Sequence, residues 1–564
     1  MENKDKLHDI RTFTDVRELI EWAGETYGER IAYSYRTGSL SSPILKKSFA
    51  QLRDDVRALG SEMLRMGCAG KHCAIVGKNT YEWVAVYFAA QSVGAILVPM
   101  DRDWPAADLA ETAQSADVAF LFCEEELKEK AEAIASRCAL SAPTVYLLAK
   151  AEERSVTALI ETGRETYAAD PDAFANAPID PHDLSLLVFT SGTTGKGKGV
   201  MLSQDAILQD LTSAIPYIDF AENTVGVLPP HHTYGSSVMF IGHAIIGSEI
   251  YLSSGLRYVQ KELIEQKPGH LVLVPLYLET FYRKIMANIK EQGKEKLISR
   301  MIKLSNGLRK VGIDLRKTFF SAIGAAFGGR VKMVITGGAP VNPDIMDFFD
   351  AVGITILNGY GITECAPLIA VNRSRHVVKG SVGHPIDIDE VVIDEPNEDG
   401  EGEILVKGPN VMLGYYKNEE ATEAAFKDGY FRTGDYGKMV DGVLTITGRK
   451  KNLIILSNGK NVYPEEIENE LIATPGILDI IVYEGQSKRG LSHNAIVAEV
   501  YPDKEYFEKN GISDIEGFLK PYINAYNKTA VPYKKIAILK VRDTEFPKNT
   551  LRKIMRFKLD MTIE

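Results

Sequence analysis

A loop rich in glycine, hydroxyl and lysine side chains could bind a phosphate chain. The loop, 189–199, follows the apolar run LSLLVF, which has the pattern of a buried strand. Its glycines expose backbone N–H groups, its hydroxyls add donors and its lysines add positive charge, which together suit an anionic ligand. A flexible surface loop is the simpler alternative, but hydroxyls between glycines directly after a strand favour phosphate binding. The candidate binding residues are Thr190, Ser191, Gly192, Thr193, Thr194, Gly195 and Lys198.

The same loop satisfies the spacing G-x-x-x-x-G-K of a Walker phosphate loop, from Gly192 to Lys198. In a Walker loop the next residue is Ser or Thr, whose hydroxyl holds Mg²⁺. Here that residue is Gly199, so the metal ligand is missing. A P-loop nucleoside triphosphatase, which would release ADP and phosphate, therefore ranks below other phosphate-binding functions.

Alternating strand and helix patterns surround the loop and predict the scaffold that positions it. Short apolar runs at 73–77, 95–100 and 118–123 alternate with helical patterns, and the alternation returns around 184–190. Such alternation is typical of an α/β fold whose mostly parallel sheets are covered by helices. From about residue 391 the pattern changes to short strands with tight turns. We therefore expect stacked, mostly parallel sheets with helices, then a β-subdomain, then a small α+β unit.

The length of 564 residues predicts at least two domains, because single hydrophobic cores stop growing near ~250–300 residues. We place a large domain at 1–448, a hinge at 449–451 and a small mobile domain at 452–564. The small unit has strand patterns of its own. It also has a helical pattern that begins at Pro464, and proline is favoured at the first helical position.

Composition excludes several broad classes of protein. There are 65 Lys and Arg against 76 Asp and Glu, giving a formal net charge of −11, which argues against nucleic-acid binding. The five cysteines lack CxxC spacing and are typical of reduced thiols in a cytoplasmic enzyme. The sequence has no run of ~18 apolar residues to cross a membrane, and its polar start does not resemble a signal peptide. We expect a cytoplasmic enzyme with no stable protein partner.

One basic stretch contrasts with the acidic chain as a whole. Residues 275–327 have helical periodicity, and a solvated helix face is the simpler interpretation of their charges. A patch for peripheral contact with a membrane surface is the alternative. The basic residues that define the stretch are Lys284, Lys290, Lys294, Lys296, Arg300 and Lys303.

Further motifs accompany the phosphate loop in a fixed order: TGGAP at 336–340, NGYGITECAP at 358–367, YFRTGD at 430–435, GRKKNLIILSNGKNVYPEEIE at 448–468 and FPKNTLRKIMR at 546–556. With TSGTTGKGKG, this set resembles the adenylate-forming superfamily of acyl-CoA synthetases, adenylation enzymes and firefly-type luciferases. It is most similar to bacterial long-chain fatty acyl-CoA synthetases. The family loop usually has proline where this sequence has Gly197. Nothing in the sequence indicates the dedicated acid that a luciferase needs.

The resemblance implies a nucleotide and metal site. Thr190 and Glu364 would help to hold Mg²⁺, while Thr363 would contact the α-phosphate of ATP. Asp435 would accept hydrogen bonds from both ribose hydroxyls, as an acceptor-only carboxylate can, and Arg449 would steady the ribose or phosphate. The adenine site would comprise the flat face of Tyr360 together with Gly338, Ala339, Pro340, Asn358, Gly359 and Gly361.

The resemblance also implies two catalytic residues. Lys553, in an Arg552-Lys553 pair where the family has Gly-Lys, matches the lysine that reaches the carboxylate and the α-phosphate. His232, in LPPHHTYG, aligns with a histidine beside the carboxylate site. Gly459 would lie where the pantetheine arm of CoA enters. Rotation about 449–451 would present Lys553 for adenylation and then the Gly459 face for thioester formation.

The implied function is ATP-dependent activation of a medium- to long-chain fatty acid to acyl-AMP, followed by transfer to CoA with release of AMP and pyrophosphate. The implied small molecules are ATP, Mg²⁺, a carboxylic acid and CoA. An acyl-AMP ligase that loads an acyl carrier protein is the nearest alternative. A degenerate nucleotide-binding sensor or scaffold is a third hypothesis, disfavoured by the intact set of Thr190, Glu364, Asp435 and Lys553.

Overall fold

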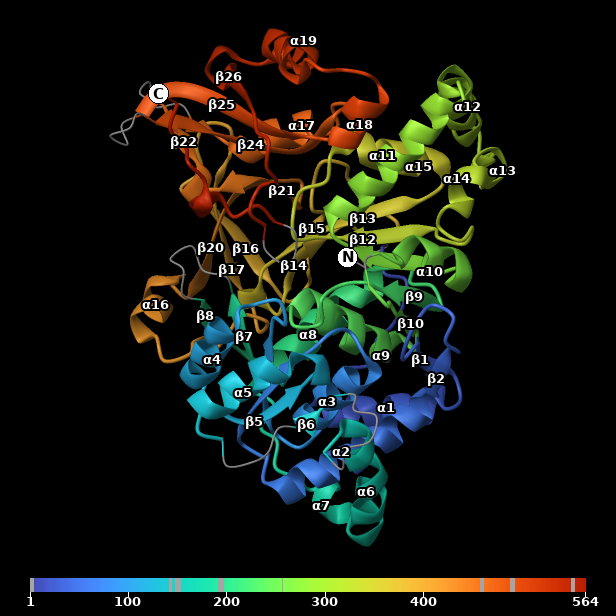
Figure 1. The fold of residues 1–564 in the computed structure, drawn as a ribbon, viewed down its shortest axis with the longest axis vertical. Coiled ribbons are helices and arrows are strands. Elements are labelled where there is room, and N and C mark those ends of the chain that lie inside the picture. Colours follow the sequence, from blue (N-terminus) through green and yellow to red (C-terminus); the bar gives the residue numbers. More distant parts are fainter. Residues whose placement is uncertain are drawn as a thin grey trace.

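The computed structural model describes residues 5–140, 145–147, 154–190, 197–255, 257–456, 461–486, 492–548 and 553–563. Figure 1 shows sheets and helices stacked along the long axis, with the C-terminal elements gathered at one end. Strands of several sheets run parallel and are flanked by helices, so the predicted α/β fold is confirmed.

A seven-stranded sheet carries the predicted phosphate loop. Its order is β18-β8-β7-β4-β3-β5-β6, parallel from β7 to β6, with β8 and β18 antiparallel at one edge. Thr190 and Lys198 are paired residues at the loop end of the β7–β8 hairpin, so the sheet holds both ends of the loop. The strands are β3 (His72–Val76), β4 (Ile96–Met100), β5 (Val118–Cys123), β6 (Val145–Tyr146), β7 (Leu184–Thr190), β8 (Lys198–Ser203) and β18 (Gly414–Tyr415).

Two further sheets form the middle of the body. One has the order β2-β1-β10-β9 and the other β11-β12-β13-β14-β15. In the second, β12 and β13 are parallel, and Thr336 at the end of β12 is paired with Asn358 of β13. The strands are β1 (Ile31–Tyr35), β2 (Leu45–Ser48), β9 (Asn223–Gly226), β10 (Glu249–Leu252), β11 (His270–Leu273), β12 (Met333–Thr336), β13 (Thr355–Gly361), β14 (Leu368–Val371) and β15 (His384–Pro385).

Helix α3 (Tyr81–Ser92) is buried on every side. Its sequence, YEWVAVYFAAQS, is apolar around most of the circumference, which is the pattern of a central core helix and not of a surface one. Thr80 caps its start by accepting a hydrogen bond from the Trp83 N–H. The Trp83 ring packs against Phe240 with centroids 5.7 Å apart, which anchors the π-helix η3 (Tyr234–Ile241) that follows His232.

The other helices of the body cover the sheets (Figure 1). They are α1 (Val16–Tyr27), α2 (Phe49–Met66), α4 (Ala106–Ser115), α5 (Lys128–Arg137), α6 (Val156–Ala169), α7 (Pro171–Ala175), α8 (Gln204–Ala214), α9 (Gly242–Ile246), α10 (Val259–Gln266), α11 (Pro275–Glu291), α12 (Glu295–Arg309), α13 (Arg316–Phe319), α14 (Ser321–Ala325), α15 (Pro343–Val352) and α16 (Glu419–Ala424). The predicted helical character of 275–327 is confirmed by α11 to α14.

A small β-sheet leads from the body toward the end of the chain. Its order is β16-β17-β20-β19, with β21 paired to β20. These antiparallel strands are β16 (Glu390–Asp394), β17 (Gly402–Lys407), β19 (Phe426–Lys427), β20 (Tyr430–Val440) and β21 (Val443–Arg449). A 3₁₀ turn, η5 (Lys450–Asn452), follows β21 directly.

From Ile454 onward the chain builds hydrophobic clusters of its own, one around Val462, Ile467 and Val500 and another around Phe546. The elements are β22 (Ile454–Ile455), β23 (Asn461–Val462), α17 (Pro464–Leu471), β24 (Ile477–Gln486), β25 (Ser492–Pro502), α18 (Lys504–Lys509), α19 (Ile515–Thr529) and β26 (Ile536–Val541). Helix α17 begins at Pro464, as predicted.

Candidate functional site

The first wall of the site is a shelf at the carboxyl ends of β12 and β13. Gly338 has φ +87°, a left-handed conformation that favours glycine, and it turns the chain so that Gly338, Ala339 and Pro340 are exposed. Asn358 is buried, and its amide donates to the Ser381 carbonyl at 3.3 Å. The shelf therefore presents open backbone above a buried polar side chain.

Two buried polar atoms beneath the shelf fit a bound base. The Asn358 Oδ1 and the Thr336 Oγ1 are buried and have no hydrogen-bond partner among the described residues. Thr336 and Asn358 are paired residues of neighbouring parallel strands, so their side chains share one face of the sheet. Because buried polar groups are normally satisfied, these two atoms indicate a ligand that supplies polar partners, such as the edge of a base.

A second wall joins three charged or polar residues from three strands. The Tyr360 hydroxyl of β13 donates to Asp435 Oδ2 at 2.9 Å, and Arg449 Nε lies 3.2 Å from Asp435 Oδ1. Asp435 and Arg449 are directly opposed on β20 and β21. Tyr360 and Asp435 are buried, whereas the Arg449 side chain is 45% exposed. The Asp435 carboxylate raises the pKa of Arg449, which therefore keeps its positive charge.

The candidate metal ligands lie at the two ends of a chain of contacts. Tyr415 of β18 donates from its hydroxyl to Glu364 Oε1 at 3.0 Å. Lys198 Nζ lies 4.4 Å from the centroid of the Tyr415 ring, and the Thr190 hydroxyl donates to the Lys198 carbonyl at 3.5 Å. Burial raises the pKa of Glu364, with Lys198 among the groups that oppose the rise.

Oxygen ligands of this kind suit Mg²⁺, a hard ion that keeps several waters and is commonly shared with substrate phosphates. The hydroxyl of Thr190 and the carboxylate of Glu364 would hold it. The described part of the chain contains no group of three or more His, Cys, Asp and Glu side chains that could hold a metal alone. An ion at this position would therefore need oxygen ligands from a bound phosphate chain.

The buried side-chain amide of Asn410 stabilises the turn after Glu364. The Asn410 Nδ2 donates to the Leu368 carbonyl at 2.9 Å and lies 3.2 Å from the Cys365 carbonyl. Asp210 accepts from the Leu368 N–H at 3.2 Å, and the same Asn410 amide lies 3.2 Å from Asp389 Oδ2. Burial raises the pKa of Asp389 to about 7.

Sequence reasoning missed Asn410, Asp210, Asp389 and Tyr415. The motif that contains Glu364 does not predict them: Asp389 and Asp210 are 21 and 200 residues from Asn410 along the chain, and Tyr415 is 51 residues from Glu364. The one available signal was the polar Asn410 within the run PNVMLGYY. A polar residue in an otherwise apolar segment is expected to have buried partners.

His231 and His232 form a third wall. Their rings are 4.3 Å apart, and His231 Nε2 lies 3.6 Å from Asp101 Oδ2. Burial lowers the pKa of His231 to about 4, and burial with the neighbouring His231 lowers the pKa of His232 further below its usual range. Both rings are therefore neutral near pH 7. The His232 carbonyl accepts from the Ser236 hydroxyl at 3.0 Å, which ties it to the start of η3.

Lys553 reaches this site from the C-terminal segment. Its Nζ lies 3.8 Å from the position that a Cβ on Gly338 would occupy, so its amine sits on the shelf. Burial, followed by the positive charge of Arg449, lowers the pKa of Lys553 to about 8, and Asp435 acts in the opposite direction. The charge of Lys553 also contributes to the lowered pKa of His232.

Two other basic residues of the same motif, Lys548 and Arg556, are engaged elsewhere. Lys548 Nζ forms an ion pair with Asp479 at 2.6 Å. Arg556 forms an ion pair with Glu468 and donates to the Val482 carbonyl at 2.8 Å. The structure therefore brings Lys553, and neither Lys548 nor Arg556, to Gly338. Of the predicted site residues, Ser191 to Gly195 and Gly459 lie outside the described residues.

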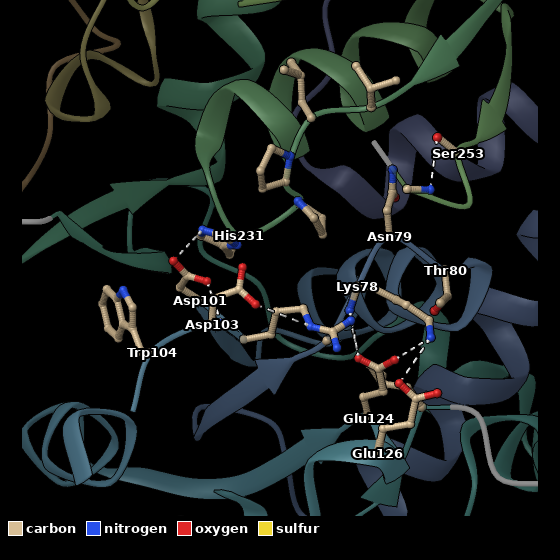
Figure 2. Close-up of a pocket in the computed structure, with 18 of the residues that line it drawn as sticks. Lys78, Asn79, Thr80, Asp101, Asp103, Trp104, Glu124, Glu126, His231 and Ser253 are labelled. Atoms are coloured by element: carbon tan, nitrogen blue, oxygen red, sulfur yellow. Dashed lines mark hydrogen bonds and ion pairs between the residues drawn. The ribbon is translucent and has the colours of Figure 1, made fainter. Parts of the chain in front are cut away.

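A cavity of about 1580 Å³ opens beside these walls (Figure 2). It extends from Thr190 and His231 past Trp104 to a cluster of charges. In that cluster Glu124 lies between Lys78 Nζ at 2.7 Å and Arg102 Nη1 at 2.8 Å. Part of the lining comes from the C-terminal segment, namely Lys548, Met555, Phe557 and Lys558. The site therefore adjoins a cavity large enough for an extended ligand, with a charged cluster on part of its wall.

No helix in the part of the chain that the structure describes is both long enough and apolar enough to cross a bilayer.

Comparison with known proteins gives concordant matches. The sequence pattern of the AMP-binding enzyme family matches residues 20–416, which ends before Asp435, Arg449 and Lys553. A long-chain-fatty-acid–CoA ligase, FadD15 of Mycobacterium bovis, is 29% identical over 77% of this chain and 74% of its own.

Solved structures share the fold over nearly the whole length of this chain and of their own. The anthranilate CoA ligase AuaEII, in complex with anthranoyl-AMP, has a TM-score of 0.76 at 17% identity, covering 99% of this chain and 98% of its own. The o-succinylbenzoate CoA synthetase MenE of Bacillus subtilis, with ATP and magnesium, has a TM-score of 0.70 at 21% identity, covering 96% and 98%.

Proposed function

The chain belongs to the AMP-binding enzyme family, and on that premise we propose that it is a fatty acid:CoA ligase. It would join a medium- to long-chain carboxylic acid to the AMP part of ATP with release of pyrophosphate, then transfer the acyl group to CoA with release of AMP. The main support for this proposal is that the Lys553 amine lies at Gly338, beside the Asp435–Arg449 ion pair. One cleft thus holds a base shelf, a ribose acceptor and two cations.

Adenylation demands that two anions meet, a carboxylate and the α-phosphate. Two unit charges ~4 Å apart repel by roughly 4 kcal/mol at an effective dielectric of ~20. Lys553 and Arg449 would offset this repulsion and stabilise the charge that develops on the reacting phosphate. Thr363, at the start of the 3₁₀ turn η4 (Thr363–Cys365), would donate to the same phosphate. The neutral His232 would border the carboxylate without adding charge.

Nucleotide positioning would come from the opposite side of the cleft. Asp435 keeps lone pairs beyond those used by Tyr360 and Arg449, because a carboxylate has about four acceptor sites. These would accept the ribose hydroxyls, while adenine would lie between the Tyr360 region and the shelf of Gly338, Ala339 and Pro340. Mg²⁺, when bound at Thr190 and Glu364, would neutralise charge on the phosphates; Tyr415 would orient Glu364 through its hydroxyl.

Thioester formation needs different surroundings at the same carbonyl, and we propose that the unit at 452–564 rotates relative to 1–448 about a hinge at 449–451. The separate hydrophobic clusters that begin at Ile454 support this division. Lys450, within the hinge, forms an ion pair with Glu403 at 2.7 Å that rotation would break. Gly459 would then face the pantetheine arm of CoA. Hinges of this kind confine the change to a few residues at the ends of elements.

The experiment that tests this function measures which acyl chain lengths are activated and whether CoA accepts the acyl group. The relative FadD15 is named a long-chain-fatty-acid–CoA ligase, which supports a long-chain acid for this protein. Purified protein with ATP, Mg²⁺ and each of a C2 to C18 series of acids should release AMP and pyrophosphate, most rapidly with the longer acids. With CoA present, mass spectrometry should detect acyl-CoA. Accumulated acyl-AMP without acyl-CoA would favour a carrier-protein acceptor, and ADP with phosphate would refute the proposal.

A further inference from the structure

The outer face of α12 and the turn after it expose apolar side chains that the fold leaves uncovered. Leu297 is 53% exposed and Leu304 56%, and in the turn Val311 is 72% and Ile313 48% exposed. These are four of the twelve large hydrophobic residues that are exposed in the described chain, and they lie within one short segment. Exposed apolar side chains gathered in one segment indicate a contact site more strongly than scattered single residues do.

Helix α12 is held to the body from its other side. Ile298, Met301 and Ile302 pack against the buried cluster beneath the helix, and Arg309 anchors its end through an ion pair with Asp350 at 3.1 Å. Leu297 and Leu304 are seven residues apart, close to two helical turns, so they lie on one line along the outer flank. The leucines are therefore exposed although the opposite face of α12 is packed against the body.

Cationic side chains run beside this apolar line. Lys296, Arg300 and Lys303 are spaced by four and three residues and form a parallel row, and Lys310 adjoins Val311. All four are exposed, and none forms an ion pair with a residue that the structure describes. Residues 290–310 contain seven Lys and Arg against two Glu, in a chain whose net charge is −11. The surface thus combines apolar insertion points with unpaired positive charge.

We propose that this α12 surface, comprising the four exposed apolar residues and the four cations just named, docks the protein on an anionic lipid bilayer. Leu297, Leu304 and Val311 would enter the boundary between headgroups and acyl chains, and the lysines and arginine would contact lipid phosphates. Helices that lie on membranes combine these features, an apolar line and a Lys/Arg-rich flank. The docking requires none of the residues assigned to the ligase reaction.

A bilayer explains the surface better than a protein partner does. Protein interfaces are enriched in aromatic residues and depleted of lysine, whereas the α12 surface has no exposed aromatic residue and three lysines. Figure 1 shows α12 and α13 at the outer edge of the fold. The basic excess also matches the negative charge of anionic lipids.

The test is flotation of the full-length protein with vesicles in the absence of nucleotide, fatty acid and CoA. Phosphatidylcholine vesicles are compared with vesicles containing 30% phosphatidylglycerol. We expect binding to the phosphatidylglycerol vesicles that weakens as salt is raised, and little binding to phosphatidylcholine alone. No binding to either composition would refute the proposal, whatever the outcome of the ligase assay.

Two variants and a matched control locate the contact. L297S/L304S removes the apolar line, and K296E/R300E/K303E reverses the row of cations; each lost cation should lower the partition coefficient roughly fivefold. The control K520E/K528E/K535E makes the same change of charge on exposed lysines of α19 and the segment after it, and should bind like the unaltered protein. Equal loss in the control would assign the binding to net charge alone and overturn the proposal.

Insertion and self-association are measured directly. In L304W, tryptophan emission should shift to the blue when phosphatidylglycerol vesicles are added, because the new ring would leave water. An unshifted spectrum with bound vesicles would place the contact elsewhere and refute the assignment. A dimer in solution that dissociates in L297S/L304S would identify the α12 surface as a contact between copies of the chain and would equally overturn the proposal.

Discussion

Asp435 and Arg449 face each other across the β20–β21 pair, with Arg449 Nε 3.2 Å from Asp435 Oδ1. Asp435 is buried and also accepts from Tyr360, so this carboxylate connects the small β-sheet to β13. Arg449 is also the first residue of the proposed hinge at 449–451. The pair therefore couples the proposed nucleotide-binding wall to the point about which the C-terminal unit would turn.

Replacing the carboxylate of this pair should weaken nucleotide binding. Asp435→Asn keeps the size of the side chain but removes its charge and half of its acceptor capacity. Hydrogen bonds to charged groups contribute about 1.5–3 kcal/mol, so the Kd for ATP measured by calorimetry should rise roughly 10- to 100-fold. Asp428→Asn, in the exposed turn before β20, is the matched control and should leave the Kd unchanged. Equal affinity in D435N would contradict the ribose role.

Removing the amine of Lys553 should separate the two half-reactions. Lys553→Ala should lower the rate of ATP–pyrophosphate exchange roughly 10²–10³-fold, because a preorganised donor to the reacting phosphate is lost. Thioester formation from a chemically prepared acyl-adenylate should proceed as in the unaltered protein, since in the proposed mechanism that step uses another face of the C-terminal unit. Lys520→Ala, on exposed α19, is the control. Comparable losses in both half-reactions would show that Lys553 has another role.

The pH dependence of adenylation should report the same amine. Burial and the charge of Arg449 lower the pKa of Lys553 to about 8, and only the protonated form carries the charge that stabilises the phosphate. The exchange rate should therefore fall as the pH rises through about 8. Lys553→Arg, whose guanidinium remains charged, should keep its rate between pH 7 and 9.5, even if that rate is lower. A decline with the same midpoint in K553R would attribute the pH effect to a different group.

Protein stability should depend on pH through Asp389. Burial raises the pKa of Asp389 to about 7 from the ordinary value near 3.8, so the folded state binds this proton more tightly than the unfolded state. Stability from this group is complete below about pH 4 and is lost as the pH rises toward 7 and beyond. Asp389→Asn should flatten the change in Tm between pH 5 and 8, whereas the exposed Asp399→Asn should not. An unchanged slope in D389N would show that Asp389 is ionised throughout.

Asn410, whose amide supports the turn after Glu364, should affect the Mg²⁺ dependence of the reaction without binding the ion itself. Asn410→Ala removes the donor that spans the Cys365 and Leu368 carbonyls, leaving buried acceptors unpaired. We expect a loss of about 1–3 kcal/mol in the free energy of unfolding. If the turn positions Glu364, the Mg²⁺ concentration for half-maximal exchange should also rise several-fold, measured where N410A is still folded. A stability loss with unchanged Mg²⁺ dependence would limit Asn410 to a structural role.

Local patterns in the sequence were sufficient to predict many of the elements and to select several candidate site residues. The apolar run before Thr190 predicted β7, and the helix beginning at Pro464 follows from the preference of proline for the first turn. Glu364, Asp435 and Lys553 stand in motifs whose order along the chain made them candidate site residues. These features depend on neighbouring residues, so one sequence contains the information needed to find them.

Tertiary structure alone decided which of these residues meet. Tyr360 and Asp435 are 75 positions apart, and their hydrogen bond depends on how β13 is placed against the β17–β20 sheet. Lys553 stands at Gly338, while its neighbours Lys548 and Arg556 are held in ion pairs, a distinction that motif spacing cannot make. Periodicity records which face of an element is buried, but the register between distant strands, and the partners of a buried amide such as Asn410, arise only when the whole core packs.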